Sequence, residues 1–194
     1  MKLKNIAVFR QERGSLKVLG ELNHAFKIKS FWIYFTLALV WVSFIYYFSN
    51  QSYEKQDITY WIQTYLPEKT WKSQLSWIQF QYNGNEISIQ HIGYLNFVGF
   101  MIRKLAHLVE FSILGVVIFR ILVLFFRPLA SLALTLCCGC LLAALDEFQQ
   151  RFATHRTSLA SDVILDMIGI MLGVLLCFIW YGIKIGLSNG RRKK

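Results

Sequence analysis

Charged residues are scarce in this 194-residue sequence: Asp, Glu, Lys and Arg make up 16% of it. Soluble domains contain about 25% of these residues. Hydrophobic residues make up 55% of the sequence and are concentrated in a few long runs. This composition argues against an ordinary cytosolic enzyme, a disordered chain and a small disulfide scaffold.

Several sequence patterns of reactive sites are also missing. No CxxC pair, His/Cys cluster or HExxH segment provides the spacing of a zinc site, and no GxSxG, nucleophilic Cys–His pair or phosphate-binding loop is present. We therefore predict no metal and no cofactor. All four cysteines fall inside apolar runs, where we expect them to be small buried residues; they are Cys137, Cys138, Cys140 and Cys177.

The formal net charge is +10, and the excess lies entirely in the two terminal segments. Residues 1–30 contain seven Lys/Arg and two acids, and residues 182–194 contain five Lys/Arg and no acid. Residues 31–181 contain nine of each sign. Basic tails around a neutral centre are typical of membrane flanks, and they exclude the continuous basic face of a nucleic-acid-binding protein.

Four windows are long and apolar enough to cross a membrane, which takes roughly 20 residues. Pro128 separates the second window from the third, so these two should form an antiparallel pair. No cleavable signal precedes the first window, which we interpret as a retained anchor. The sequence therefore predicts an all-α membrane fold, a bundle of four transmembrane helices. The windows are 31–49, 105–126, 129–145 and 163–181.

The basic tails also predict the orientation. Four spans place both termini on one side, and the positive-inside rule makes that side the cytoplasm. Residues 50–104 and the turn 146–161 would then lie outside the cytoplasmic membrane. Arg103 and Lys104 oppose this orientation, but the basic residues of the tails outnumber them.

The long segment 50–104 should be folded. An apolar stripe at helical spacing predicts a helix over 54–66 that lies at the membrane interface and ends at Pro67. Its members are Ile58, Trp61, Ile62, Tyr65 and Leu66.

Asn83-Gly84 then predicts the turn of a β-hairpin, because both turn positions need positive φ. Counting outward from the turn pairs Phe80 with Ile87 and Ile78 with Ile89. We expect the helix and hairpin to cap the outer mouth of the bundle.

Ionisable side chains inside or next to the predicted spans are costly and therefore candidates for function. The predicted topology brings them to one side of the membrane. They are Lys104, His107, Glu110, Asp146, Glu147, Arg156, Asp162 and Asp166, accompanied by the uncharged polar residue Gln150.

We expect the Glu110 side chain to face the bundle interior and to pair with His107, Arg156 or Lys104. Gly169 and Gly173 should permit close approach of the fourth span, placing it centrally with its Asp face toward spans two and three.

These residues allow three interpretations. One is a structural network that only holds the helices together, in which the acids Glu110, Asp146, Asp162 and Asp166 pair with nearby cations, and Gly169 and Gly173 permit close helix approach. The second is an anion site, formed by Lys104, His107, Gln150 and Arg156. The third adds acid–base catalysis, with His107, Glu110, Asp146 and Glu147 as the candidates. A metal site from His107, Glu110, Asp146, Glu147 and Asp162 has suitable ligand types, but a single histidine argues against it.

Two segments resemble the VanZ-like family of bacterial membrane proteins: RKLAHLVEFSILG at 103–115 and DEFQQRFATHRTSLASDVILDMIGIMLG at 146–173. The family pattern reads K-x-x-H-x-x-E/Y, D-E-x-x-Q, an Arg, then D-x-x-x-N/D-x-x-G-x-x-x-G. In this sequence the pattern falls on Lys104, His107, Glu110, Asp146, Glu147, Gln150, Arg156, Asp162, Asp166, Gly169 and Gly173. The family often has Asn where this chain has Asp166, and Pro-Gly where it has Thr154-His155.

The resemblance implies a multi-pass protein of the bacterial cytoplasmic membrane. The founding member is associated with resistance to teicoplanin, a glycopeptide that carries a lipid, so the family name implies a phenotype rather than a reaction. We expect membrane lipids as partners, together with a lipid-linked or lipoglycopeptide ligand, no nucleic acid, and compatibility with a homo-oligomer. The alternatives are a membrane enzyme acting on lipid-phosphate or lipid-linked cell-wall substrates, and a proton-coupled transporter or scaffold.

Overall fold

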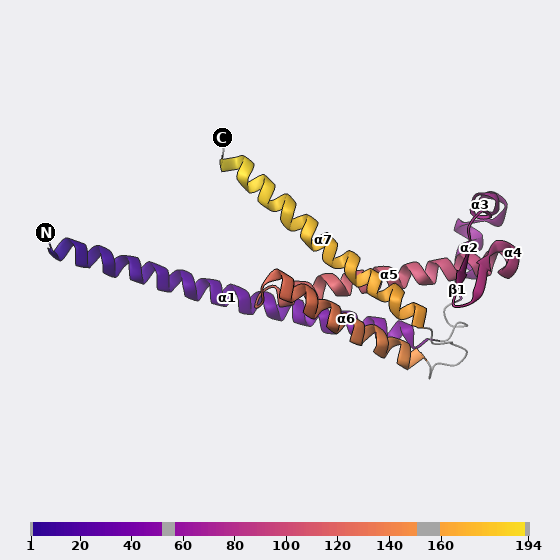
Figure 1. Cartoon of the computed structure of the whole chain (residues 1–194), viewed down its shortest axis with the longest axis horizontal. Helices are drawn as coiled ribbons and strands as arrows, with labels where there is room; N and C mark the ends of the chain where they lie inside the picture. The colour runs from indigo at the N-terminus through magenta and orange to yellow at the C-terminus, as the bar shows by residue number, and fades with distance from the viewer. Residues whose placement is uncertain (1, 52–56, 151–159, 193–194) are drawn as a thin grey trace.

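The computed structural model describes residues 2–51, 57–150 and 160–192. Long helices form a bundle, and short elements gather at one end of it, away from the N- and C-terminal ends of the chain (Figure 1). The elements are α1 (Lys2–Ser49), α2 (Thr59–Tyr65), α3 (Glu68–Leu75), β1 (Gln79–Tyr82), β2 (Asn85–Ser88), α4 (Ile89–Ile92), α5 (Tyr94–Leu122), α6 (Pro128–Gln150) and α7 (Ala160–Arg192).

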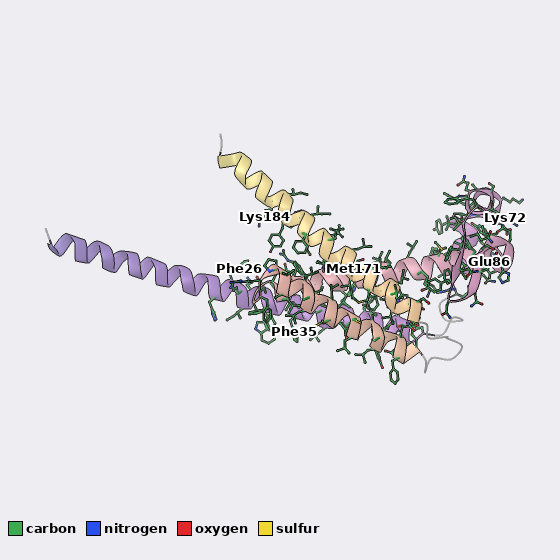
Figure 2. All side chains as sticks on the ribbon, viewed as in Figure 1. Phe26, Phe35, Lys72, Glu86, Met171 and Lys184 are labelled. Carbon is green, nitrogen blue, oxygen red and sulfur yellow. The ribbon has the colours of Figure 1, made fainter. Side chains whose placement is uncertain are left out.

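Four helices of the described chain are long and apolar enough to cross a membrane: His24–Ser49, Tyr94–Leu122, Pro128–Gln150 and Ala160–Lys184. Their outer surfaces are apolar as well, as the exposed side chains of Phe35 and Met171 illustrate (Figure 2). Lys72 lies on the short elements and Lys184 toward the other end of the bundle. The predicted four-helix membrane bundle is confirmed, whereas the side of the membrane on which each end lies stays a prediction.

The helices extend beyond the predicted spans. α1 continues back through the basic segment to Lys2, and α5 begins at Tyr94, well before the predicted start at Leu105. Pro128 is the first residue of α6, where its missing N–H costs no hydrogen bond. The turn between α5 and α6 is short, so the predicted antiparallel pair is present.

Helix α7 packs most extensively against α5 and also contacts α6, the two spans that it was predicted to face. The predicted central place of α7 is wrong, because α5 is the helix that packs against α1, α6 and α7. The contact with α5 is close because Gly169 and Gly173 of α7 face the α5 backbone. A Cβ at Gly169 would lie 2.7 Å from the Leu108 carbonyl oxygen, and one at Gly173 would lie 2.0 Å from that of Ser112. No side chain fits at either position, so glycine sets the distance between the two helices.

All four long helices meet in one apolar core near the middle of the bundle. Partly buried hydrophobic residues, including Trp41 and Val42 of α1, surround it. The buried members are Ile45, Phe111, Leu114, Ala143 and Ile170.

The short elements α2, α3, β1, β2 and α4, called the hairpin unit below, have a separate apolar core. It includes the first turns of α5, so the unit is built directly on a membrane helix. Its buried members are Ile62, Ile87, Ile89, Tyr94, Phe97 and Val98.

The predicted β-hairpin is present, with Asn83 and Gly84 at positive φ (51° and 78°) and Phe80 opposite Ile87. The predicted pairing of Ile78 with Ile89 is wrong. The antiparallel ladder stops at Gln79 and Ser88, because the Ser88 hydroxyl caps α4 by accepting a hydrogen bond from the His91 amide.

The predicted helix over 54–66 is shorter in the structure. It begins at Thr59, whose amide donates to the Asp57 carboxylate at 2.8 Å, and residues 52–56 lie outside the described residues. Three of the five residues in its apolar stripe belong to the core: Ile62 is buried, and Ile58 and Leu66 pack against it partly buried. Trp61 and Tyr65 are exposed and stack on each other with ring centroids 5.6 Å apart. This exposed pair is the surface available to a membrane interface.

All four cysteines are free, and only Cys177 is buried. The prediction that the cysteines are buried is wrong for the other three, because their side chains lie on the outer surface of α6. The exposed cysteines are Cys137, Cys138 and Cys140.

Candidate functional site

The predicted polar residues converge at the end of the bundle beside the hairpin unit. Three helices supply them: α5 in its first half, α6 in its last turns and α7 in its first turns. Five are buried, namely Asp146, Glu147, Gln150, Asp162 and Asp166. Arg156 and His155, also considered from the sequence, lie outside the described residues. Together Lys104, His107, Asp146, Gln150, Asp162 and Asp166 are called the polar cluster below.

Asp162 connects the hairpin unit to the bundle. One of its carboxylate oxygens accepts hydrogen bonds from both the Lys104 ammonium of α5 and the Tyr82 hydroxyl of β1. The Lys104 ammonium also lies 5.0 Å from the centre of the Tyr82 ring and 5.5 Å from that of Phe100. The sequence offers Lys104 as an anion-binding residue and as one of three possible partners of Glu110. The partner that the structure gives it is the Asp162 carboxylate.

Tyr82 was not among the predicted site residues. The sequence does indicate that Tyr82 lies next to the hairpin turn and that it shares a face of the strand with Phe80. Nothing in the sequence links it to Asp162, 80 positions away. Partial burial, together with the hydrogen bond to Asp162, raises the pKa of the Tyr82 phenol far above its ordinary value.

The raised pKa of Tyr82 predicts a late-titrating phenol. The contribution of this group to stability should be complete below pH ~10, where an unfolded tyrosine is still protonated. It should be lost as the pH rises further, because the unfolded chain then releases the proton more readily than the folded chain does. The titration of Tyr82 can be isolated by subtracting the spectrophotometric titration curve of Tyr82→Phe from that of the wild type. The midpoint of this difference curve should lie above the pH range in which ordinary tyrosines titrate. In Asp162→Asn the same difference should move down toward pH ~10; an ordinary midpoint in the wild type would contradict the contact.

His107 lies between two carboxylates from different helices. Its Nδ1 atom is 3.4 Å from the Asp166 Oδ1 atom, and Asp146 of α6 offers an oxygen such that all three ligand-type atoms lie within 4.8 Å of one another. The structure therefore pairs His107 with Asp166, a partner that the sequence did not indicate. Glu110 is half-buried, and its backbone carbonyl accepts a hydrogen bond from the Trp41 indole of α1 at 2.9 Å.

Asp166 is fully buried, and neither of its carboxylate oxygens accepts a hydrogen bond from a described residue. The Nδ1 atom of His107 is likewise buried without a hydrogen bond, since its approach to Asp166 lacks hydrogen-bond geometry. Buried polar atoms normally have partners, so this pair is the most unusual feature of the site.

Gln150 joins the polar cluster to α1. Its side-chain amide donates to Asp146 at 2.8 Å, the contact that their i, i+4 spacing predicts, and also to the Ser49 hydroxyl at 2.8 Å. The next residue, Gln149, donates to the Tyr46 carbonyl at 3.3 Å. These bonds hold the ends of α1 and α6 together. Glu147, a predicted catalytic candidate, is also buried in this turn of α6.

An apolar cavity of about 430 Å³ adjoins the polar cluster between α1, α5 and α6. Asp146 belongs to both the cavity lining and the polar cluster. The other lining residues are almost all apolar: Val42, Ile45, Phe111, Leu114 and Leu142 lie inside, with Tyr46, Leu145, Phe148 and Gln149 at the rim.

The apolar helix surfaces and the polar site at one end of the bundle define a polytopic helical membrane protein. The sequence profile of the VanZ/LLP1 family matches residues 31–181. The chain therefore belongs to the VanZ/LLP1 family, as its motifs indicated. Comparison with curated proteins and with solved structures gives no match.

Proposed function

We propose that this VanZ/LLP1 protein binds a lipid-linked ligand, with the ligand's apolar chain in the cavity and its head group at the polar cluster. The observation that carries the proposal is the double role of Asp146, which lines the cavity and belongs to the polar cluster. An apolar cavity that ends at a few convergent polar groups is the common form of a ligand site, and its volume lies in the usual range of about 300–1,000 Å³.

The position of the cavity supports a ligand that enters from the membrane. Its rim residues Tyr46, Leu145 and Phe148 are more than half exposed on the apolar surface of the bundle. A chain could therefore move from the lipid phase into the cavity without crossing water. The head group would then lie at the level where α6 ends and the hairpin unit begins.

A lipoglycopeptide has this amphiphilic form, as does a lipid-linked cell-wall precursor. We propose that occupation of the site contributes to resistance against teicoplanin-type glycopeptides. In the predicted orientation, with both termini in the cytoplasm, the polar cluster faces the surface where such drugs meet the membrane. Arg156 remains the predicted contact for an anionic head group. Arg156→Ala should abolish any resistance that expression of the wild type confers, and unchanged drug sensitivity at equal protein level would contradict this role.

Filling the cavity should prevent ligand binding. In Leu142→Trp the indole would occupy the space next to Ile45 and Asp146, whereas in the matched control Leu141→Trp it would point away, since Leu141 is 63% exposed and does not line the cavity. With purified protein in nanodiscs, labelling by a polyprenyl phosphate that carries a photoreactive group should fall about tenfold in the first variant, equivalent to ~1.4 kcal/mol. Equal labelling of both variants would refute the cavity as the binding site.

The second candidate is a membrane enzyme that acts on lipid-phosphate or lipid-linked substrates. The arrangement that favours it is His107 beside Asp166 and Asp146, since an imidazole held by a carboxylate is suited to proton transfer. Release of phosphate from a polyprenyl diphosphate by the wild type, lost in Asp146→Asn, would support this candidate. Retained drug resistance in Asp146→Asn would favour simple binding.

A further inference from the structure

We propose that His107, Asp146 and Asp166 form a binding site for one divalent transition-metal ion, for which Zn²⁺ and Mn²⁺ are the appropriate probes. This proposal departs from the expectation of no metal, which rested on sequence spacing alone. The three ligands come from three helices, α5, α6 and α7, so no local motif could reveal them.

The geometry needs little adjustment to hold an ion. One ligand atom from each residue lies within 4.8 Å of the other two. Ligand atoms about 2.0–2.2 Å from a zinc ion are on the order of 3–4 Å apart, so small side-chain rotations close the site. Asp166 is fully buried, and its two oxygens lack hydrogen bonds from the described residues. They are therefore available as metal ligands, as is the Nδ1 atom of His107.

The ligand chemistry indicates the class of ion. Imidazole nitrogen favours the zinc and iron group of metals, and carboxylate oxygen is accepted by zinc and manganese. Three protein ligands also match the ligand number of metal sites that keep one coordination position open. Mg²⁺ and Ca²⁺ prefer all-oxygen sites and fit the His107 nitrogen less well.

The local charge gives the ion a role. Lys104 is paired with Asp162, which leaves the buried carboxylates Asp146 and Asp166 facing His107. An anionic head group would be repelled by these carboxylates, whereas a divalent ion between them would neutralise the site and attract a phosphate. This part of the inference rests on the proposed function; binding of the metal itself does not.

The test uses the full-length protein in detergent and needs no ligand. After dialysis against Zn²⁺ or Mn²⁺ and removal of free ion, elemental analysis should find about one bound ion per chain. Asp166→Asn and His107→Ala should each weaken binding at least about a hundredfold, because even outer-shell changes cost about 10–100-fold. The matched controls Glu68→Gln and His91→Ala change an exposed acid and an exposed histidine and should bind as the wild type does.

Three results would overturn the inference. The first is failure of the wild-type protein to retain the ion. This result needs no variant and therefore does not depend on whether a variant folds. The second is wild-type affinity in Asp166→Asn. The third is a thiolate-to-metal charge-transfer band with Co²⁺, which would place the ion on the exposed cysteines of α6 instead. If the wild type retains no ion but its lipid labelling still depends on the cavity, only this inference is refuted. If the wild type retains the ion but its lipid labelling does not depend on the cavity, only the proposed function is refuted.

Discussion

Gly173→Ala should force α5 and α7 apart and destabilise the whole bundle. The added Cβ would lie 2.0 Å from the Ser112 carbonyl oxygen and 3.1 Å from the Val116 amide nitrogen, both backbone atoms that cannot rotate away. Overpacking usually costs about 1–3 kcal/mol. Alanine favours a helix over glycine by about 1 kcal/mol, which offsets part of this cost. Because a rigid backbone is the obstacle, we expect a cost near the upper end of the range and a net loss of ~2 kcal/mol. Unfolding in mixed detergent micelles provides the measurement.

Gly182→Ala is the matched control, because Gly182 lies in the same helix with nothing within 4 Å of the added Cβ. Its free energy of unfolding should be unchanged or slightly increased. Equal stability of Gly173→Ala and Gly182→Ala would mean that the close approach of α5 and α7 is not required for folding.

Asp162→Ala should loosen the hairpin unit from the bundle. The substitution leaves the Lys104 ammonium and the Tyr82 hydroxyl without the carboxylate that accepts both hydrogen bonds. Removing one partner of a buried ion pair costs about 3–5 kcal/mol. Since the Lys104 side chain is 21% exposed, we expect a loss of ~2–3 kcal/mol. Hydrogen exchange should also accelerate in β1 and β2 more than in the middle of α6.

The exposed ion pair between Glu68 and Lys72 provides the control. Its side chains are 50% and 57% exposed, so Glu68→Ala should cost less than ~1 kcal/mol. In the double variant Asp162→Leu/Lys104→Met, apolar contacts replace the ion pair, and part of the stability should return. A cost for Asp162→Ala no greater than that for Glu68→Ala would show that Asp162 does not hold the two parts together.

Features that depend on local sequence could be predicted well. The lengths of the apolar runs identified four membrane helices, because only a helix of about 20 residues satisfies its backbone across a bilayer. Asn83-Gly84 identified the hairpin turn because few other residues adopt positive φ at both positions. The spacing of Gly169 and Gly173 likewise identified the closest helix contact.

Pairings between distant residues could not be predicted. The sequence brought His107, Asp146 and Asp166 to one end of the bundle, but the rotation of each helix decides which side chains meet. That rotation depends on packing in the apolar core, where many arrangements satisfy the same pattern of apolar residues. The pairing of Lys104 with Asp162 and of His107 with Asp166 was therefore not foreseen, and Tyr82 was missed.

Helix α5 belongs to two cores: Phe97 and Val98 pack in the hairpin unit, and Phe111 and Leu114 pack in the membrane bundle. Because this one continuous helix contributes to both cores, the hairpin unit cannot be exchanged between proteins as a segment that ends where α5 begins. A chimera joined at Gly93 would leave the incoming unit without the aromatic and aliphatic floor on which it folds. Swaps between relatives should instead carry the chain through Met101, so that each unit arrives with its own segment of α5 and the junction falls inside an unbroken helix.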